Sequence, residues 1–479
     1  MLFNSLHFLI FFPVVAALFF AAPDRYRLPL LFLASCYFYM AFIPAYILIL
    51  FVLIAVDYTA GILIERATGK ARKRYLVLSL IANIGMLGVF KYFNFFSTNV
   101  AAVNQWLGIP VHPILLHLAL PIGLSFHTFQ SMSYTIEVYR GNQKAERNLL
   151  VYSVYVLFFP QMVAGPIERP YNLLPQLRRP VRFETNRVTE GLRIMLWGFI
   201  EKVVVADRLA LYANQVFNDP ARHHGLTVLL GIYFFSFQIY CDFSGYSHIA
   251  IGAAKILGFN LMTNFKRPYF ADSIADFWKR WHISLSTWFR DYLYIPLGGN
   301  RVPVWHWYLN LFLVFLISGF WHGANWTFLV WGALHGAYLI AAIVLAPLRS
   351  NVLSRLRLRG TEWGIRALDT VVTFHLVTFA WIFFRARSIA DAGLICRNLF
   401  QWTTGRVSFE YPLGPSDLTL AFLCIAFLLF VDSLHGRFSF AQALSVRPRW
   451  LRWSFYYATV FGILFFGVLT QSKFIYFQF

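Results

Sequence analysis

Long apolar runs separated by short basic loops are the main pattern of the chain. A membrane-spanning helix needs roughly 20 mostly apolar residues, and about a dozen runs approach that length. We therefore predict an all-α, polytopic membrane protein with about 11–12 spanning helices. The predicted spans are Leu2–Ala22, Leu28–Ile43, Ala45–Ile64, Tyr75–Phe96, Ile114–Ile136, Arg193–Tyr212, Val228–Ala250, Trp305–Phe320, Ala324–Ala346, Ala367–Phe384, Leu418–Val431 and Phe455–Leu469.

The basic residues collect in clusters between these runs. Because cytoplasmic loops of membrane proteins carry an excess of Lys and Arg, we expect these clusters on the cytoplasmic side and both termini on the outward side. Leu149–Gly165 interrupts this alternation, since it is apolar, lies between two basic loops and contains Pro160 near its end. We predict a re-entrant or interfacial piece there, covered by protein or lining a water-filled cavity.

Composition supports the same class. The chain is 59% hydrophobic and only 13% charged, whereas soluble domains are about a quarter charged. The net charge of +20 follows from the loop clusters, so it indicates membrane orientation and no nucleic-acid partner. The four cysteines are scattered without the spacing of a metal or redox site and are interpreted as packing residues.

We expect one membrane-embedded domain over residues 1–479, without internal inverted repeats. Two of its segments are distinct: a cytoplasmic amphipathic loop at 260–304 and an aromatic C-terminal motif at 474–479. A further long loop, Arg387–Asp417, faces outward in this scheme and is predicted to be polar and irregular.

The cytoplasmic loop contains the first candidate chemistry. Asp272 or Ser273 can cap a helix, and the apolar and aromatic residues from Phe277 onward recur at helical spacing with basic residues between them. A basic, Trp-rich amphipathic helix of this kind lies in the membrane interface, where most of its residues serve as scaffold. His282 is different, because the hydroxyls of Ser284 and Ser286 lie within about one turn of it.

A second polar segment, Ser318–Thr327, separates two apolar runs. It contains His322 between Gly319 and Gly323, with Asn325 about one turn farther on, where its amide can fix the histidine tautomer. An ionisable residue at membrane depth is costly and usually faces a cavity or a partner. A histidine hydrogen-bonded inside a helix bundle is the simpler reading, but two such histidine motifs in one chain favour a functional site.

Other polar groups within the predicted spans leave two readings open. Asp242 and Tyr246 follow an aromatic run, and His127, Gln130 and Glu137 recur at near-helical spacing in another span. Either group can line a pore, although partners inside the bundle are the favoured reading.

Three segments together resemble the membrane-bound O-acyltransferase superfamily: Phe277–Ser286, Arg290–Gly299 and Trp321–Asn325. The resemblance is to the bacterial branch that contains the alginate O-acetyltransferase membrane subunit, peptidoglycan O-acetyltransferases and the teichoic-acid D-alanylation protein. Further similar segments are Pro121–Phe126, Phe159–Ile167, Asp242–Ser247 and Trp381–Arg385.

The resemblance implies a helical fold around a central funnel and assigns roles to the histidines. His322 corresponds to the catalytic histidine of the family, and His282 to its second histidine on the cytoplasmic side of the funnel. We expect neighbouring side chains to bind substrate, namely Trp321, Asn325, Trp281, Ser284, Arg280, Asp242 and Tyr246.

The C-terminal motif Phe474–Phe479 has two interpretations. Taken alone it is an aromatic belt at the membrane interface. It also resembles a C-terminal acyl-transfer motif of the same branch, in which a tyrosine hydroxyl carries the acyl group transiently. Here that residue is Tyr476.

The predicted function is therefore acyl transfer across a bacterial cytoplasmic membrane. The resemblance implies acetyl-CoA or an acyl-carrier-protein thioester as donor, no bound cofactor, a polysaccharide acceptor, and an extracytoplasmic partner of the serine-hydrolase (SGNH) type. Imidazole suits this chemistry because it can take a hydroxyl proton near neutral pH. The alternative is a transporter, or a structural subunit of a polysaccharide export complex without catalysis of its own. A transporter predicts paired charges within the membrane, and the sequence makes none evident.

Overall fold

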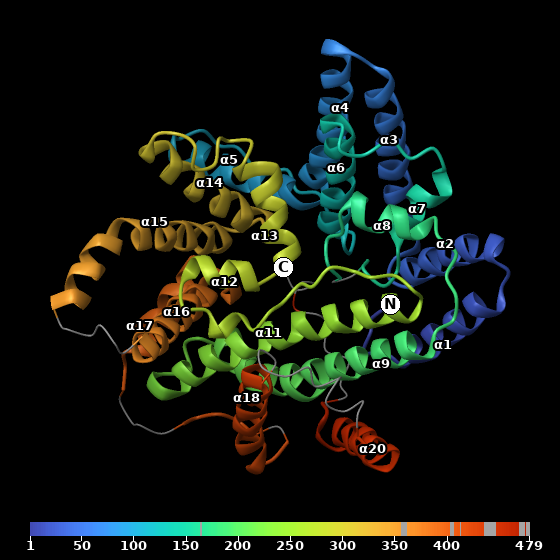
Figure 1. Cartoon of the computed structure of the whole chain (residues 1–479). Coiled ribbons are helices and arrows are strands. Elements are labelled where there is room, and N and C mark those ends of the chain that lie inside the picture. The colour runs from blue at the N-terminus through green and yellow to red at the C-terminus, as the bar shows by residue number, and fades with distance from the viewer. Residues whose placement is uncertain are drawn as a thin grey trace. The chain divides into compact units, whose positions relative to one another are not determined.

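The computed structural model describes residues 1–162, 165–355, 362–402, 407–411, 413–434, 447–468 and 475. Within these ranges the chain forms helices and connecting segments and no strand, which confirms the all-α prediction. Figure 1 shows the helices in chain order. They are α1 (Leu6–Ala21), α2 (Asp24–Met40), α3 (Ile47–Arg66), α4 (Gly69–Leu87), α5 (Phe93–Trp106), α6 (Leu124–Arg140), α7 (Leu149–Leu157), α8 (Pro170–Leu177), α9 (Thr185–Phe199), α10 (Asp207–Asn218), α11 (Gly225–Ile256), α12 (Ile274–Arg280), α13 (Ile283–Phe289), α14 (Val304–His322), α15 (Trp326–Arg355), α16 (Glu362–Arg385), α17 (Ile389–Leu399), α18 (Ser416–Leu434) and α20 (Arg449–Phe466).

Seven helices of the described chain are long and apolar enough to cross a bilayer. They are Pro44–Arg66, Gly69–Trp106, Gly225–Ile256, Val304–His322, Trp326–Asn351, Trp363–Arg385 and Ser416–Leu434, and the apolar α1 is somewhat shorter. The protein is thus a multi-pass membrane protein. The described residues thus contain fewer candidate membrane spans than the dozen apolar runs of the sequence.

The predicted span Ile114–Ile136 is wrong as a continuous helix. Residues 107–123 have no regular structure, and α6 begins only at Leu124. Pro121 and Gly123, whose φ is +74°, lie just before that start. A proline ring and a left-handed backbone both prevent a helix from continuing, although the run is apolar enough to suggest one.

The loop Arg387–Asp417, predicted to be irregular, contains helix α17. Its N-cap is Ser388, whose hydroxyl accepts the Asp391 N–H at 3.0 Å. A serine followed three residues later by an acid is a helix-start signal, so the polar composition of this loop hid a regular element.

The segment Leu149–Gly165 forms a nine-residue helix, α7, which is too short to span a bilayer. Turns follow it at residues 158–162, and its C-terminal half is buried within the protein. His127 Nδ1 lies 3.0 Å from the Val156 carbonyl oxygen, and the Gln130 amide donates to the Tyr155 carbonyl oxygen. The polar side chains of α6 therefore satisfy the ends of α7 instead of lining a pore.

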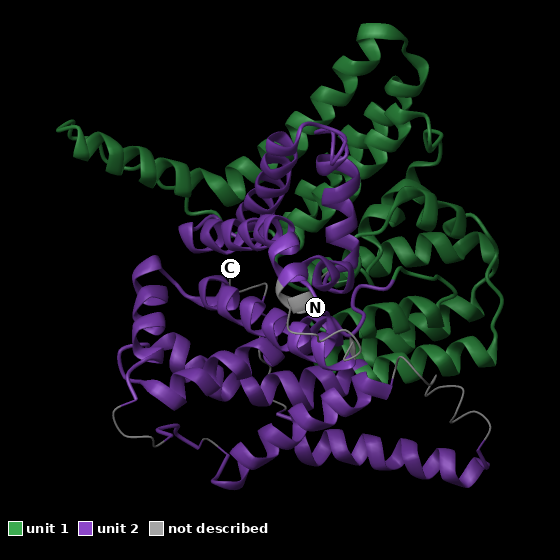
Figure 2. Ribbon diagram, turned by 60° about the vertical axis from the view of Figure 1, so that its left-hand side comes forward, with its two compact units in different colours: residues 1–197, 246–262 green, residues 198–245, 263–479 purple. Residues whose placement is uncertain are grey.

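The chain forms two compact units (Figure 2). Unit 1 comprises Met1–Trp197 with Tyr246–Met262, and unit 2 comprises Gly198–Gly245 with Thr263–Phe479. The division falls inside α9 and α11. In unit 1, α3, α4 and α6 pack against one another, and in unit 2, α14 and α15 form a closely packed pair.

Glycines allow α14 and α15 to pack this closely. A Cβ atom at Gly319 would lie 2.2 Å from the Phe328 carbonyl oxygen, and one at Gly332 would lie 2.3 Å from the Phe315 carbonyl oxygen. Small residues let membrane helices approach until their backbones touch, which supplies packing that lipid cannot. The position of His322, the last residue of α14, depends on this contact.

Replacement of Gly332 by Ala should force α14 and α15 apart, because the new methyl group collides with backbone that cannot rotate away. We expect a loss of about 1–3 kcal/mol of stability, measured as a lower melting temperature of the detergent-purified protein. Gly364→Ala is the matched control, since nothing lies within 4 Å of its Cβ position in α16 and alanine favours helix. Equal melting temperatures for the two variants would contradict the packing role of Gly332.

Candidate active site

The first histidine lies at a break between two short helices. Ser273 caps α12 as predicted, its hydroxyl accepting the Asp276 N–H at 3.2 Å. Helix α12 ends at Arg280, and α13 begins at Ile283. Between them His282 has a left-handed backbone with φ 43° and ψ 54°, a conformation that costs about 1 kcal/mol or more outside glycine. The predicted amphipathic helix is thus two helices with the histidine at their junction.

The aromatic side chains of this region are buried within unit 2. Phe277 is 1% exposed and Trp281 is 2% exposed. The Trp281 ring lies 5.2 Å from the Phe265 ring and 5.0 Å from the Trp381 ring. The prediction of a surface helix in the membrane interface is therefore wrong for this aromatic face, which belongs to the protein core.

Asn264 holds the break together from 18 positions upstream. Its backbone carbonyl accepts the Ile283 N–H at 2.9 Å. Its side-chain Oδ1 accepts the Ser284 N–H at 3.3 Å and the Ser284 hydroxyl at 3.0 Å, and it lies 3.0 Å from His282 Nδ1. Asn264 thus satisfies the first N–H groups of α13, a task that an N-cap side chain normally performs.

These contacts determine the tautomer of His282. A backbone N–H can only donate, so the Asn264 atom that it contacts is the carbonyl oxygen and His282 Nδ1 must carry the proton. The Nε2 lone pair remains as the acceptor of a neutral ring. Complete burial lowers the pKa of His282 to about 3, because water no longer stabilises the imidazolium ion.

The second histidine lies in an aromatic cage at the end of α14. His322 is 6% exposed. The rings of Trp321, Trp331 and Phe384 lie 4.9, 5.1 and 5.2 Å from its own. Gly323 closes the turn, since a Cβ atom there would lie 2.1 Å from the Phe328 ring. The cage keeps bulk water away from an imidazole that is able to exchange protons.

A continuous row of tryptophans joins the two histidine motifs. Trp281 packs against Trp381, whose ring is stacked 5.9 Å from that of Trp331. Trp331 in turn contacts His322. Unit 2 therefore brings both predicted motifs, 40 positions apart in the sequence, onto one aromatic cluster.

The remaining predicted substrate-binding residues have structural partners. Ser284 is fully buried and bonded to Asn264. Arg280 pairs with Asp276 at 2.8 Å across one turn of α12. The Asn325 amide accepts the Thr327 N–H at the start of α15 and donates to the Arg387 carbonyl, just after α16.

Two further predicted site residues, Tyr246 and Tyr476, differ in what the structure says of them. Tyr246 belongs to unit 1, where its hydroxyl donates to Asn4 at 3.0 Å and its ring stacks on Phe3. Tyr476 lies outside the described residues.

Asp242 lies in a buried charge cluster that the sequence did not reveal. The Lys202 ammonium contacts Asp242 at 2.6 Å and Asp207 at 2.7 Å, and all three side chains are less than 5% exposed. Lys202 lies in η3 (Ile200–Ala206), a π-helical stretch between α9 and α10. A charge pair that the sequence did not make evident, and that a transporter would also contain, is therefore present in a candidate span, since Asp242 lies in α11.

The sequence analysis also missed Asn264 and Lys202. Asn264 is 18 positions from His282 in sequence and has no local spacing signal, although it lies in the same polar loop as the histidine. Lys202 did have a signal: it is a cation inside the predicted span Arg193–Tyr212, and such a residue requires a partner.

Comparison with known proteins identifies this arrangement. Residues 142–384, which include Asn264, His282 and His322, match the model of the MBOAT, membrane-bound O-acyltransferase family. The chain belongs to this family. It is accordingly an acyltransferase, an enzyme embedded in a membrane.

Three relatives show the range of proteins in this family to which the chain is similar. A probable alginate O-acetylase of Azotobacter vinelandii is 38% identical, with 94% of this chain and 88% of the relative covered. A peptidoglycan O-acetyltransferase of Helicobacter pylori is 37% identical, with 77% and 73% covered. A teichoic acid D-alanyltransferase of Bacillus subtilis is 29% identical, with 56% and 69% covered.

We expect His282 to stay neutral, with its proton on Nδ1, from pH 8 to pH 5. In the unfolded chain the ring has a pKa near 6.5, so below that pH only the unfolded state gains the proton and stability falls as the pH falls. Nitrogen-15 spectra of histidine-labelled protein, assigned with a His282→Gln variant, measure both tautomer and titration. A resonance of His282 that titrates near pH 6.5 would contradict the assignment.

Asn264→Ala should shift the His282 proton from Nδ1 toward Nε2, because the accepting oxygen is lost. The same spectra detect this exchange as a swap of the two ring-nitrogen shifts. Asn325→Ala serves as the control, since both hydrogen bonds of its amide go to Arg387 and Thr327. A tautomer unchanged in Asn264→Ala would show that the amide does not determine it.

Proposed function

We propose that this enzyme takes an acetyl group from a cytoplasmic thioester and passes it across a bacterial cytoplasmic membrane for O-acylation of an extracytoplasmic polysaccharide. The observation that carries the proposal is the single aromatic cluster that holds His322 and the His282 motif. Such a cluster offers a water-poor reaction site inside a membrane domain, which protects an activated acyl group from hydrolysis.

The relatives support acetyl as the acyl group. The O-acetylase and O-acetyltransferase relatives are 37–38% identical over at least 77% of this chain. The D-alanyltransferase relative is 29% identical over 56%. We therefore propose a polysaccharide acceptor of the alginate or other exopolysaccharide type, with peptidoglycan as the next candidate.

His322 acts as the general base in this proposal. Its imidazole takes the proton of the acceptor hydroxyl while that oxygen attacks the carbonyl carbon of the thioester. A C–O bond forms, the C–S bond breaks, and the proton passes from the imidazolium to the departing thiolate. Acetyl-CoA and an acyl-carrier-protein thioester both supply this chemistry.

His282 has a different task. A base with a pKa near 3 binds a proton too weakly to hold it during the reaction at neutral pH. A neutral ring with a fixed Nδ1–H can instead accept a hydrogen bond at Nε2 from an amide N–H of the acyl donor or from the departing thiol. We propose His282 as a hydrogen-bonding residue of the donor side and His322 as the proton acceptor.

Tyr476 is proposed as the transient acyl carrier. Its neighbour Ile475 is 1% exposed, and the Ile475 N–H donates to Asp242 at 2.7 Å. The Val468 N–H donates to the Val203 carbonyl at 3.0 Å. The C-terminal segment is thus attached to unit 2 at two points, which supports a role for it inside the protein in preference to a belt at the membrane surface.

The transfer of the acetyl group to the polysaccharide then requires a second protein. An extracytoplasmic acyltransferase of the SGNH serine-hydrolase type would accept the acetyl group from Tyr476 and esterify the polymer. A phenol ester suits this relay because phenolate is a better leaving group than an alkoxide.

The transporter alternative loses support from the way the buried charges are satisfied. Lys202 contacts two carboxylates, and the Ile475 backbone occupies the other oxygen of Asp242. These charged groups are paired with other groups of the protein, so a bound solute is not needed to neutralise them.

His322→Ala should abolish polymer acetylation, because the hydroxyl proton then has no acceptor. We expect a loss of at least about 10²-fold, measured as ester-bound acetate on the secreted polysaccharide. His224→Ala removes an exposed histidine and should leave acetylation unchanged. Wild-type acetylation in a stably expressed His322→Ala protein would overturn the proposal.

Tyr476→Phe should remove an acetylated C-terminal peptide that the wild-type protein yields when the polymer acceptor is withheld. Mass spectrometry of the rapidly acidified protein detects a gain of one acetyl group on that peptide. Tyr457→Phe, an exposed tyrosine of α20, is the matched control. If the wild-type peptide is never acetylated, Tyr476 is not a carrier, and the role of His322 is then judged by its own test.

A further inference from the structure

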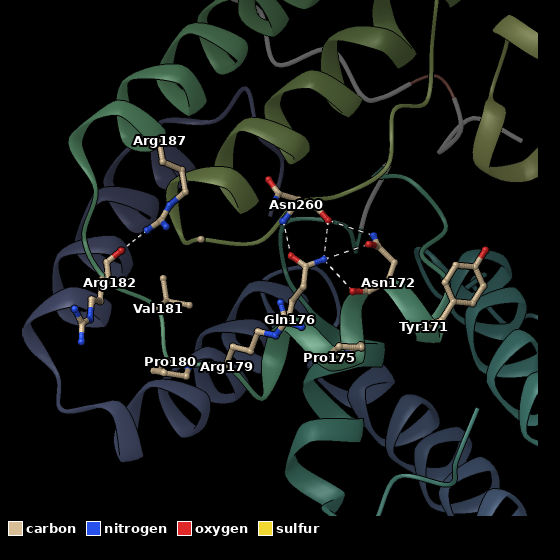
Figure 3. Close-up of a pocket in the computed structure, with 11 residues that line it drawn as sticks. Tyr171, Asn172, Pro175, Gln176, Arg179, Pro180, Val181, Arg182, Arg187 and Asn260 are labelled. Atoms are coloured by element: carbon tan, nitrogen blue, oxygen red, sulfur yellow. Dashed lines mark hydrogen bonds between the residues drawn. The ribbon is translucent and has the colours of Figure 1, made fainter. Parts of the chain in front are cut away.

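A polar pocket in unit 1 lies outside the histidine cluster. It has a volume of about 480 Å³ and is formed by α8, the segment that follows it, the first turn of α9 and the segment after α11 (Figure 3). Small-molecule sites commonly have volumes of roughly 300–1,000 Å³. Neither histidine motif contributes to it, so the acyl-transfer proposal leaves the pocket unexplained.

Three arginines give the pocket its charge. Arg179, Arg182 and Arg187 line it, and no Asp or Glu is among its lining residues. Arg187 donates to the Arg182 carbonyl oxygen, as Figure 3 shows, while its Nε is buried without a hydrogen-bond partner in the described structure. A buried guanidinium N–H without an acceptor is costly, and an anion in the pocket would supply one.

Nearby acids do little to neutralise this charge. Glu184 lies 3.6 Å from Arg187 but is 61% exposed, so water weakens the pair. Glu168 does not line the pocket. Its carboxylate accepts hydrogen bonds from the Asn172 amide and the Met262 N–H. Burial also raises the pKa of Glu168 to about 7, which leaves it partly neutral at physiological pH.

Hydrogen-bonded amide side chains form another part of the pocket wall, beside Arg179 (Figure 3). The Gln176 amide donates to the Asn260 carbonyl at 3.0 Å and accepts the Asn260 N–H at 2.8 Å. Asn172 adds a further bond to the same carbonyl (Figure 3). These paired bonds hold the two chain segments apart at a constant distance, so the hollow does not depend on a ligand for its shape.

The pocket lies beside the end of an apolar helix. Its residue Val181 accepts a hydrogen bond from Arg27, close to the turn between α1 and α2. Phe183, 62% exposed, packs edge-on against Phe20 at 5.2 Å. Arginines and exposed aromatic rings together at a helix end are typical of the membrane–water interface, where lipid phosphates are concentrated.

We propose that this arginine pocket is a binding site for a phosphate-bearing ligand at the membrane interface. Guanidinium groups form paired hydrogen bonds with phosphate oxygens, and three of them more than balance the negative charge of a phosphodiester or phosphomonoester. Two sources carry this chemistry: the headgroup of an anionic phospholipid and the nucleotide part of a CoA thioester. The lipid source goes beyond the acyl-transfer reaction, whereas the CoA source rests on the proposed function, because CoA is the proposed carrier of the acyl group.

The test measures binding to the full-length, detergent-purified protein by native mass spectrometry. The probes are dioleoyl-phosphatidylglycerol, dioleoyl-phosphatidylcholine and free CoA. We expect phosphatidylglycerol to be retained in preference to phosphatidylcholine, and the variant Arg179→Gln, Arg182→Gln, Arg187→Gln to lose that preference by at least tenfold. The matched control Arg66→Gln, Lys70→Gln, Arg74→Gln removes three exposed charges from the α3–α4 turn and should retain it.

The probes also separate the two sources. If CoA displaces bound phosphatidylglycerol from the wild-type protein but does not displace phosphatidylcholine, the phosphate site also takes the nucleotide. Failure of CoA to displace the lipid identifies the lipid headgroup. Arg187→Lys keeps the charge but loses the paired donors, so it should weaken binding several-fold.

Equal retention of every probe by the arginine triple variant and the wild type would overturn the site. His322→Ala should keep the preference for phosphatidylglycerol, because His322 does not line the pocket. A failure of acyl transfer and a failure of this pocket are thus detected by different measurements.

Discussion

The amide of Asn264 holds the backbone around His282 in a conformation that the chain would otherwise avoid. Its Oδ1 accepts the Ser284 N–H at the start of α13 and faces His282 Nδ1, while the backbone carbonyl of Asn264 accepts the Ile283 N–H. A left-handed residue and an uncapped helix start are both unfavourable when buried. One side chain removes both penalties, and by doing so it also determines which ring nitrogen of His282 carries the proton.

Other buried charged groups of unit 2 are paired in the same way. Lys202 is shared by two carboxylates, Arg208 pairs with Asp417, and the Tyr212 hydroxyl donates to the other Asp417 oxygen at 2.8 Å. The π-helical stretch η3 carries Lys202. Such stretches are often found at functional sites, and here the irregular backbone also supplies the Val203 carbonyl to the C-terminal segment.

Much of the fold and part of the site were predictable from the sequence. Apolar runs predicted the helices, the Ser273 signal predicted the start of α12, and the two histidine motifs led to the correct family. Ile114–Ile136 failed because hydropathy does not record that Pro121 and Gly123 stop a helix. Asn264 and Lys202 were missed because their partners are brought near only by tertiary folding, and no spacing along the chain announces them.

The bond between Ile475 and Asp242 has a consequence for biosynthesis. The two residues are 233 positions apart, so the ribosome has long finished α11 when residue 475 emerges. Until then, of the two contacts that the described residues make with the Asp242 carboxylate, the one from Lys202 alone can form. Contacts of such long sequence separation form late and slowly. The segment next to the proposed acyl carrier therefore joins a helix bundle in which α11 and η3 are already synthesised.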